Sequence, residues 1–260
     1  MRKERKLNQK QIENEILNLS SQPETTRLSF RLFSRLERIL LALNLNLREK
    51  ISVENNSYVT ETYSESLQDK FALKIGNFSG LNTYIEIGSG HPVNGNNTYL
   101  LEQKKWKGFS IELDPELVSV FVDLRKNPVY CEDGTKFNYL SKINDLNFGS
   151  HIGYLQVDID PSVQSLKTLL SIPFATHKFA AITFEHDVYR SDSKIRKLQR
   201  QYLLSFGYIL IASNVKVNKF FAYEDWWVHP NLVNLTDINY FKSRNQHPLK
   251  MKWTNSLTHQ

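Results

Sequence analysis

The stretch YIEIGSG at residues 84–90 has the form of a buried strand that ends in a glycine turn. Its aromatic and β-branched residues favour a strand. Gly88 and Gly90 allow the backbone to turn sharply and to approach a ligand without a Cβ in the way, and Glu86 adds a carboxylate close to the same turn. A strand that leads through such a turn into a helix is typical of nucleotide-binding α/β proteins.

Short strand-like runs alternate with helical segments from residue 81 onward. This alternation predicts a doubly wound α/β sheet whose strands are mainly parallel. The last two runs are separated only by residues 214–218, so we expect them to form an antiparallel hairpin at the sheet edge. The expected strands are 83–87, 109–113, 129–132, 152–158, 179–184, 208–213 and 219–223, and the expected helices are 97–105, 115–125, 162–170 and 194–206.

Acidic residues follow the next two strands, at the end of a sheet where ligands of such proteins bind. Glu112 lies 24 residues after Gly88, at the end of FSIELDP, where a carboxylate can accept hydrogen bonds from both hydroxyls of a ribose. Asp133 and Gly134 end the third strand in CEDGTKF. We expect the acid to reach an adenine amino group and the glycine to let the base lie close. These residues predict a nucleoside-binding site.

The loop after Gly90 distinguishes between two nucleoside cofactors. A dinucleotide needs a third glycine and a nearby helix N-terminus for its pyrophosphate. Val93 occupies the third glycine position here, and HPVNGNN at 91–97 delays the start of the helix. We therefore predict S-adenosylmethionine, which carries adenosine but no phosphate.

Five segments make the sequence similar to a known family. They are QDKFAL at 68–73, YIEIGSGHPVNGNNTYLLEQKKWKGFSIELDP at 84–115, LQVDIDP at 155–161, ITFEHDVY at 182–189 and YEDWWVHP at 223–230. With them, the chain resembles the class I S-adenosylmethionine-dependent methyltransferases, and within these the FkbM-like family, from about residue 68 to residue 230. The resemblance implies a Rossmann-like, doubly wound sheet of seven strands, mainly parallel with an antiparallel last strand. Many relatives read Val-Glu-Gly where this chain has Ile159-Asp160-Pro161, so a role peculiar to that glycine does not carry over.

The resemblance also assigns the parts of the cofactor site. Glu86, Gly88 and Gly90 would line the methionine end of the cofactor, Glu112 the ribose and Asp133 the adenine. The full set of predicted cofactor-binding residues is Glu86, Gly88, Ser89, Gly90, Glu112, Leu113, Asp133, Gly134 and Asp158.

Acids and one histidine end the fourth and fifth strands, next to the expected methyl group. Asp158 and Asp160 follow the fourth strand, and Glu185, His186 and Asp187 follow the fifth. A hydroxyl that attacks a sulfonium must lose a proton, and we predict His186 as its base because imidazole titrates near neutral pH. Asp158 or Glu185 would orient His186 or take the proton itself. In a second interpretation, these residues hold Mg²⁺ or Mn²⁺.

Two tryptophans lie beyond the last expected strand, in the most aromatic stretch of the chain. Trp226 and Trp227 would either form an apolar wall on which a sugar ring stacks or pack in the core of the hairpin. The sequence leaves both alternatives open.

The predicted function is that of an O-methyltransferase that uses S-adenosylmethionine on a hydroxyl of a small molecule or glycan, with a saccharide as the first choice. An RNA ribose methyltransferase and a cofactor-binding interaction protein without turnover are the alternatives. The net charge is +6, but residues 51–240 hold 18 basic and 21 acidic side chains. This distribution argues against nucleic acid, which needs basic residues around the reacting centre.

The ends of the chain are expected to lie outside the catalytic domain. Apolar residues at helical spacing predict helices over 7–20 and 26–47, which would cap the domain or pair two subunits in a homo-oligomer rather than lie on anionic lipid. The polar segment 52–66 is typical of a linker. We expect an N-terminal helical extension at 1–66, a methyltransferase domain at 67–240 and a basic tail at 241–260.

Three features point to the cytoplasm. Cys131 is the single cysteine, so no intramolecular disulfide can form. The N-terminal residues MRKERKLNQKQ lack the apolar stretch of a secretory signal. The longest apolar run, 39–43, is far too short to cross a membrane.

Overall fold

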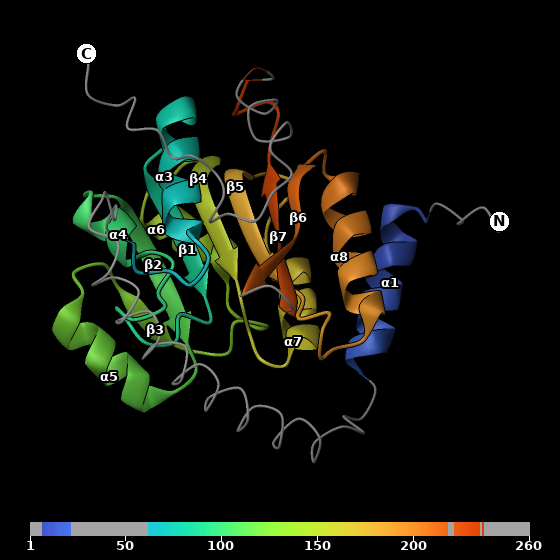
Figure 1. The fold of residues 1–260 in the computed structure, drawn as a ribbon, viewed down its shortest axis with the longest axis horizontal. Helices are drawn as coiled ribbons and strands as arrows, with labels where there is room; N and C mark the ends of the chain where they lie inside the picture. Colours follow the sequence, from blue (N-terminus) through green and yellow to red (C-terminus); the bar gives the residue numbers. More distant parts are fainter. Residues whose placement is uncertain (1–6, 22–61, 218–220, 235, 237–260) are drawn as a thin grey trace, which may run out of the picture. The chain divides into compact units, whose positions relative to one another are not determined.

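The computed structural model describes residues 7–21, 62–217, 221–234 and 236. A seven-stranded sheet in the order β3-β2-β1-β4-β5-β7-β6 forms its centre (Figure 1). This sheet confirms the predicted α/β fold. Its strands are β1 (Thr83–Ile87), β2 (Lys107–Glu112), β3 (Val129–Cys131), β4 (His151–Val157), β5 (Lys178–Glu185), β6 (Ile209–Val217) and β7 (Phe221–Val228).

The sheet is mainly parallel, with one antiparallel strand. β1 pairs in parallel with β2 on one side and with β4 on the other, and the parallel ladder extends to β3 and β5. The strand order therefore reverses between β1 and β4, which is the point where α/β sheets of this kind bind ligands. β7 runs antiparallel to both β5 and β6, as the sequence predicted.

The predicted end of the last strand is wrong. β7 does not stop at residue 223 but continues to Val228, and it lies between β5 and β6, so that β6 forms the edge of the sheet. Because a central strand is covered on both faces, Trp226 and Trp227 are both 0% exposed. They are core residues, and neither forms a wall for an acceptor.

Helices pack on the two faces of the sheet. The sequence does not predict α3 and α6, because α6 is a short segment without two full turns of apolar periodicity and α3 begins with polar residues. The helices are α1 (Gln9–Ser20), α3 (Gln68–Ser79), α4 (Tyr99–Gln103), α5 (Pro115–Leu124), α6 (Tyr139–Asp145), α7 (Ser162–Thr168) with the 3-10 turn η1 (Leu169–Ser171), and α8 (Ser193–Ser205).

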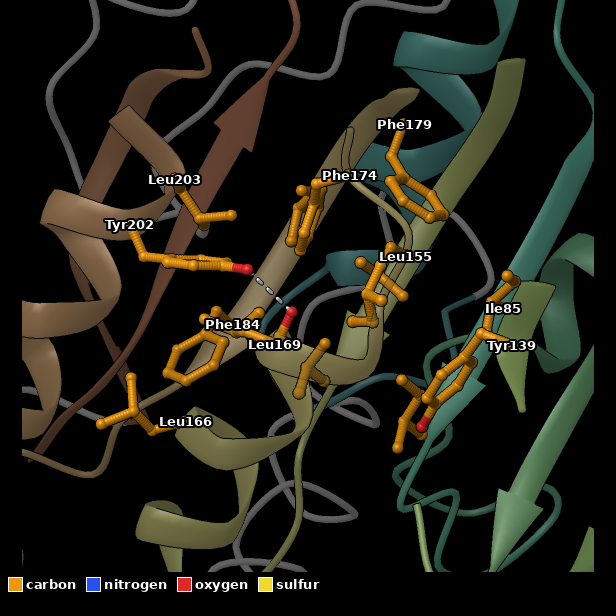
Figure 2. Packing of buried hydrophobic residues seen from close by; sticks show 14 of the residues in the cluster. Ile85, Tyr139, Leu155, Leu166, Leu169, Phe174, Phe179, Phe184, Tyr202 and Leu203 are labelled. Atoms are coloured by element: carbon orange, nitrogen blue, oxygen red, sulfur yellow. Dashed lines mark hydrogen bonds between the residues drawn. The ribbon is translucent and has the colours of Figure 1, made fainter. Parts of the chain in front are cut away.

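Two apolar clusters hold these layers together. The larger one joins α1, α6, α7 and α8 to the sheet, and Figure 2 shows part of it, with Phe174 and Phe179 edge to face at 5.6 Å. The smaller cluster covers the other face beneath α3, where Phe71 stacks on Trp226 with ring centroids 4.7 Å apart. Strand residues alternate between the two clusters, since neighbouring side chains point to opposite faces.

The N-terminal prediction is confirmed for its first helix. α1 buries Ile12 and Ile16 and contacts α7 and α8. The predicted helix at 26–47, residues 52–61 of the predicted linker and the tail at 241–260 lie outside the described residues. The end of the linker is held in place, because the Asp69 carboxylate accepts hydrogen bonds from the Thr62 and Ser64 hydroxyls, each at 2.8 Å. The division of the chain into three parts remains a prediction.

Candidate functional site at the carboxyl ends of the strands

The glycine turn after β1 contains two glycines with different surroundings. Gly88 has a φ of +73°, and a Cβ on it would lie 1.7 Å from the carbonyl oxygen of Asp158. Gly90 has a φ of +57°, and a Cβ on it would meet no atom within 4 Å. Gly88 is therefore required for packing β1 against β4, whereas Gly90 borders open space.

Ser89, between these glycines, has an unusual polar environment. The residue is 8% exposed, and its Oγ is buried without a hydrogen-bond partner among the described residues. A buried hydroxyl without a partner costs free energy unless a ligand or water satisfies it.

Glu112 ends β2 directly opposite the glycine turn. Its Oε2 accepts a hydrogen bond from the Gly90 N–H at 2.8 Å, and its Oε1 accepts from the Leu113 and Asp114 N–H groups at 2.8 and 3.0 Å. Leu113 is 67% exposed. Asp114 caps α5 by accepting from the Glu116 N–H at 2.8 Å. The structure thus brings the predicted ribose-binding acid next to the predicted methionine-binding turn.

Asp133 and Gly134 follow β3 at the same edge of the sheet. The Asp133 Oδ1 accepts hydrogen bonds from the Thr135 N–H and hydroxyl at 2.9 and 2.8 Å, and Lys136 Nζ lies 3.1 Å from Oδ2. Partial burial opposes ionisation of Asp133, but these contacts outweigh it and lower the pKa of its carboxyl. A Cβ on Gly134 would lie 2.8 Å from the Ile87 side chain, so only glycine fits there.

Glu86 is turned into the protein. It is 1% exposed, and its Oε2 accepts a hydrogen bond from the Ser110 hydroxyl at 2.6 Å. Burial raises the pKa of Glu86, and the nearby charge of Arg125 opposes this rise. Within the predicted methionine-binding group, Glu86 supports the turn from inside, Ser89 is also buried, and Gly90 borders open space.

These residues fit a cofactor that carries adenosine and an amino acid. Open space adjoins Gly90, an unsatisfied hydroxyl lies at Ser89, and two carboxylates stand at the ends of β2 and β3. Carboxylates at these positions suit hydroxyl and amino groups and would repel a pyrophosphate.

Asp158 and Glu185 form a pair of acids at the ends of β4 and β5. Burial, followed by the charges of Asp160 and Asp187, raises the pKa of Asp158 well above its usual range. Burial, followed by the charges of Asp158 and Asp187, does the same for Glu185. Two carboxyls in one partly buried site cannot easily ionise together, so each of the two charges opposes ionisation of the other acid.

Arg190 supplies the positive charge beside this pair. Its Nη2 lies 2.9 Å from Asp160 Oδ1, 2.6 Å from Asp187 Oδ2 and 3.8 Å from Glu185 Oε1. The residue follows the fifth strand in sequence, and its contacts come from the tertiary fold, so strand-end spacing alone did not identify it.

Asp187 adopts a backbone conformation that is rare for a residue with a side chain. Its φ is +46°, and the N–H groups of His186 and Asp187 both donate to the Tyr223 carbonyl, at 2.7 and 2.8 Å. The Asp187 Oδ2 also accepts a hydrogen bond from the Ser162 hydroxyl at 3.0 Å. Strained residues of this kind gather at functional sites, and Asp187, which the sequence placed at the end of the fifth strand, belongs with the acid pair.

His186 is kept apart from the two acids with which it was grouped. Its side chain is 0% exposed, its Nδ1 accepts a hydrogen bond from the Val188 N–H at 3.2 Å, and its Nε2 lies 3.5 Å from Asp225 Oδ1. Arg200 pairs with the same Asp225 carboxylate at 2.7 Å. Because the ring is fully buried and its nitrogens face the Val188 N–H and the Asp225 carboxylate, neither nitrogen is exposed to a substrate. In this arrangement His186 braces the turn after β5.

The metal interpretation finds no support. Within the described ranges, no group of three or more His, Cys, Asp or Glu residues has an arrangement that could hold a metal ion.

No helix in the described part of the chain is long and apolar enough to cross a membrane.

No family model and no curated protein sequence matches the chain. Among solved structures, it is similar to an S-adenosylmethionine-dependent methyltransferase from Clostridium acetobutylicum, with 13% identity, a TM-score of 0.41, and coverage of 71% of this chain and 99% of that one. A TehB-like S-adenosylmethionine-dependent methyltransferase from Corynebacterium glutamicum gives 11% identity and a TM-score of 0.41 over 73% and 98% of the two chains. Magnesium protoporphyrin IX methyltransferase from Synechocystis, solved with bound S-adenosylmethionine, gives 12% and 0.42 over 64% and 79%. At these low values the similarities carry no conclusion about activity, and the FkbM-like resemblance is not confirmed.

Proposed function

We propose that this chain is an S-adenosylmethionine-dependent O-methyltransferase of the FkbM-like kind, acting on a hydroxyl of a small molecule or glycan, with a saccharide as the first choice. The observation that carries the proposal is the open space at Gly90, with the Glu112 carboxylate hydrogen-bonded to the Gly90 N–H at 2.8 Å. This combination suits the junction of a ribose and a chain without phosphate, as in adenosylmethionine, and not a pyrophosphate.

Residues of three strand ends would hold the cofactor. Ser89 and Gly90 would face its amino-acid part, Glu112 its ribose hydroxyls, and Asp133 with Gly134 its adenine. When bound, the cofactor supplies an electrophilic methyl group on a sulfonium. For Glu112 to bind a ribose, it must exchange one of its present backbone hydrogen bonds for hydroxyl donors.

The Asp158–Glu185 pair would receive the proton of the acceptor hydroxyl. Their raised pKa values bring a carboxylate base closer to neutral pH, where it removes a proton more effectively than an ordinary surface acid. His186 would keep the Glu185 backbone in place through its contacts with Val188 and Asp225. The pair would thus take the proton of the acceptor hydroxyl, and the cofactor, when bound, would supply the methyl group to that oxygen and leave as S-adenosylhomocysteine.

The same acids favour a neutral acceptor with hydroxyl groups over RNA. Three carboxylates, those of Asp160, Glu185 and Asp187, lie within 4 Å of Arg190, and the Asp158 carboxyl interacts with all three of these acids. A phosphate backbone passing this edge would meet a net negative charge. No observation in the described residues favours the RNA or the non-catalytic alternative.

Calorimetry and thermal unfolding test the cofactor. S-adenosylmethionine and S-adenosylhomocysteine should bind and raise the melting temperature, whereas NAD and ATP should not. Ligand at about 100 times its Kd stabilises by roughly 2.7 kcal/mol. A shift with NAD but none with S-adenosylmethionine would overturn the proposal.

Methyl transfer tests the acceptor. The protein and methyl-labelled cofactor should yield labelled product with members of a panel of methyl glycosides. If the cofactor binds and no glycoside is labelled, the saccharide acceptor is refuted while cofactor binding stands.

A further inference from the structure

We propose that Arg125 is a positioning residue for cofactor binding, which holds the loop between β1 and α4 in the shape that receives the amino-acid part of the cofactor. Arg125 caps the C-terminal end of α5, far along the chain from the glycine turn. The inference rests on the proposed function and adds to it a residue that strand-end reasoning does not reach.

Arg125 is a buried cation with every donor satisfied. Its side chain is 0% exposed, and its five N–H groups make five hydrogen bonds. A guanidinium has five donors in a fixed planar arrangement, so this environment matches arginine and no other side chain. The acceptors are Glu102 Oε2 at 2.8 Å, the Pro92 carbonyl at 2.9 Å, Asn96 Oδ1 at 3.1 Å, the Tyr84 hydroxyl at 2.9 Å and the Thr98 hydroxyl at 3.1 Å.

Three of these acceptors belong to the loop itself, which runs from Gly88 to Thr98. Arg125 therefore fixes the loop at Pro92, in its middle, and at Asn96 and Thr98, near its end. Tyr84 lies on β1 and Glu102 on α4, the two elements that the loop connects. One side chain ties the loop to both of its anchors.

Asn96 carries the contact onward to the glycine turn. It is 1% exposed, and its Oδ1 accepts hydrogen bonds from Arg125 and from the Thr98 and Tyr99 N–H groups, the latter two at 2.9 and 2.7 Å. Its Nδ2 donates to the Ser89 carbonyl at 3.2 Å. The path from Arg125 through Asn96 thus ends at the residue whose hydroxyl is buried without a partner among the described residues.

The path touches the adenosine half of the site only through Gly90, whose N–H donates to Glu112. Glu112 and Asp133, which would hold the adenosine, receive no hydrogen bond from Arg125 or Asn96 among those described; their partners are Gly90, Leu113, Asp114, Thr135 and Lys136. Loss of the Arg125 network should therefore weaken recognition of the amino-acid part and leave recognition of adenosine intact. A general loss of stability would weaken both.

Calorimetry with two probes separates these outcomes. S-adenosylhomocysteine carries the amino-acid part, whereas 5′-methylthioadenosine has the same nucleoside without it. In Arg125→Lys, which keeps the buried charge beside Glu102 but has too few donors for the loop, we expect affinity for S-adenosylhomocysteine to fall about 10- to 100-fold. Affinity for methylthioadenosine should stay within about twofold of wild type.

Two further variants complete the experiment. Asn96→Asp keeps the oxygen that Arg125, Thr98 and Tyr99 use and replaces the amide donor to the Ser89 carbonyl, which also contacts Glu86, with a carboxylate oxygen. It should show the same selective loss even if Arg125→Lys fails to fold. Lys126→Met removes the exposed neighbouring cation and should bind both probes like wild type.

The possible results are distinct. Equal losses for both probes in Arg125→Lys and Asn96→Asp, or no loss in either variant, would overturn the positioning role while the cofactor proposal stands. If wild-type protein binds neither probe, the proposed function fails and this inference fails with it.

Discussion

Replacing the two glycines of the turn separates cofactor binding from folding. We expect Gly90→Leu to abolish cofactor binding in a folded protein, and Gly88→Ala to destabilise the fold itself. The contrast follows from the space around each glycine, since a Cβ on Gly90 meets nothing within 4 Å and a Cβ on Gly88 lies 1.7 Å from the Asp158 carbonyl oxygen.

The cost of Gly90→Leu to stability is small. The new side chain extends into open space, so only the left-handed backbone at φ +57° opposes it, which costs about 1–2 kcal/mol for a residue with a Cβ. At about 2–4 °C per kcal/mol for a domain of this size, the melting temperature should fall by no more than about 8 °C. The leucine then fills the space that the amino-acid part of the cofactor would use.

Gly88→Ala should cost more stability, because the backbone at Gly88 lies directly against the backbone at Asp158. The contact of 1.7 Å can be relieved only if the end of β1 moves away from β4. Overpacking of this kind costs about 1–3 kcal/mol, and the positive φ of +73° adds about 1–2 kcal/mol. The expected loss of stability in Gly88→Ala is therefore about 2–5 kcal/mol. This loss comes from a single methyl group, and it exceeds the loss expected from the much larger leucine at position 90.

Thermal unfolding with and without S-adenosylhomocysteine measures both effects. Wild-type protein with ligand at about 100 times its Kd should gain about 2.7 kcal/mol, or about 5–10 °C. Gly90→Leu should unfold cooperatively and gain nothing. A normal ligand shift in Gly90→Leu, or wild-type stability in Gly88→Ala, would refute the reasoning.

Three further predictions concern acids of the site and Glu224, a buried residue of β7 whose carboxylate accepts a hydrogen bond from the Trp226 indole N–H. Glu112→Ala should weaken cofactor binding about 10- to 100-fold in calorimetry, whereas Asp114→Ala should leave affinity unchanged and cost about 1 kcal/mol of stability through the lost α5 cap; equal affinity losses would contradict the assignment. Burial raises the pKa of Glu224 to about 8, so the folded protein keeps a proton that the unfolded chain releases near pH 4.5. The free energy of unfolding should therefore fall as pH rises between these two values. In Glu224→Gln, its slope against pH should be smaller than in wild type by up to about 1.4 kcal/mol per pH unit, and identical slopes would contradict the raised pKa of Glu224. Asp158→Asn and Glu185→Gln should each reduce turnover about 10²- to 10⁴-fold with unchanged cofactor affinity, and full turnover in both would exclude the acid pair as base.

Local sequence was enough to locate the strands and the positions at their ends. Apolar and β-branched runs bounded by glycine or acidic residues favour a strand whatever the tertiary context. The observed β1, β2 and β4 therefore lie within about two residues of their predicted bounds. Glu112 and Asp133 could be placed at one edge because parallel strands present their carboxyl ends on the same side. The N-terminal cap of α5 depends on local sequence alone, because Asp114 and Pro115 are neighbours in the chain.

Only the tertiary structure decided what surrounds these positions. Trp226 and Trp227 are core residues because β7 lies between β5 and β6. The residues of a strand do not by themselves determine its position in the sheet. His186 lost its predicted partners because Asp225, brought beside it by the antiparallel pairing of β5 and β7, lies against its ring. The raised pKa values of Asp158 and Glu185 depend on burial by neighbours distant in sequence, and the contacts of Arg125 span 41 residues, to Tyr84. Hydrogen bonding and desolvation act between groups that are close in space. The sequence therefore identified the ionisable groups, whereas their partners and pKa values depend on the fold.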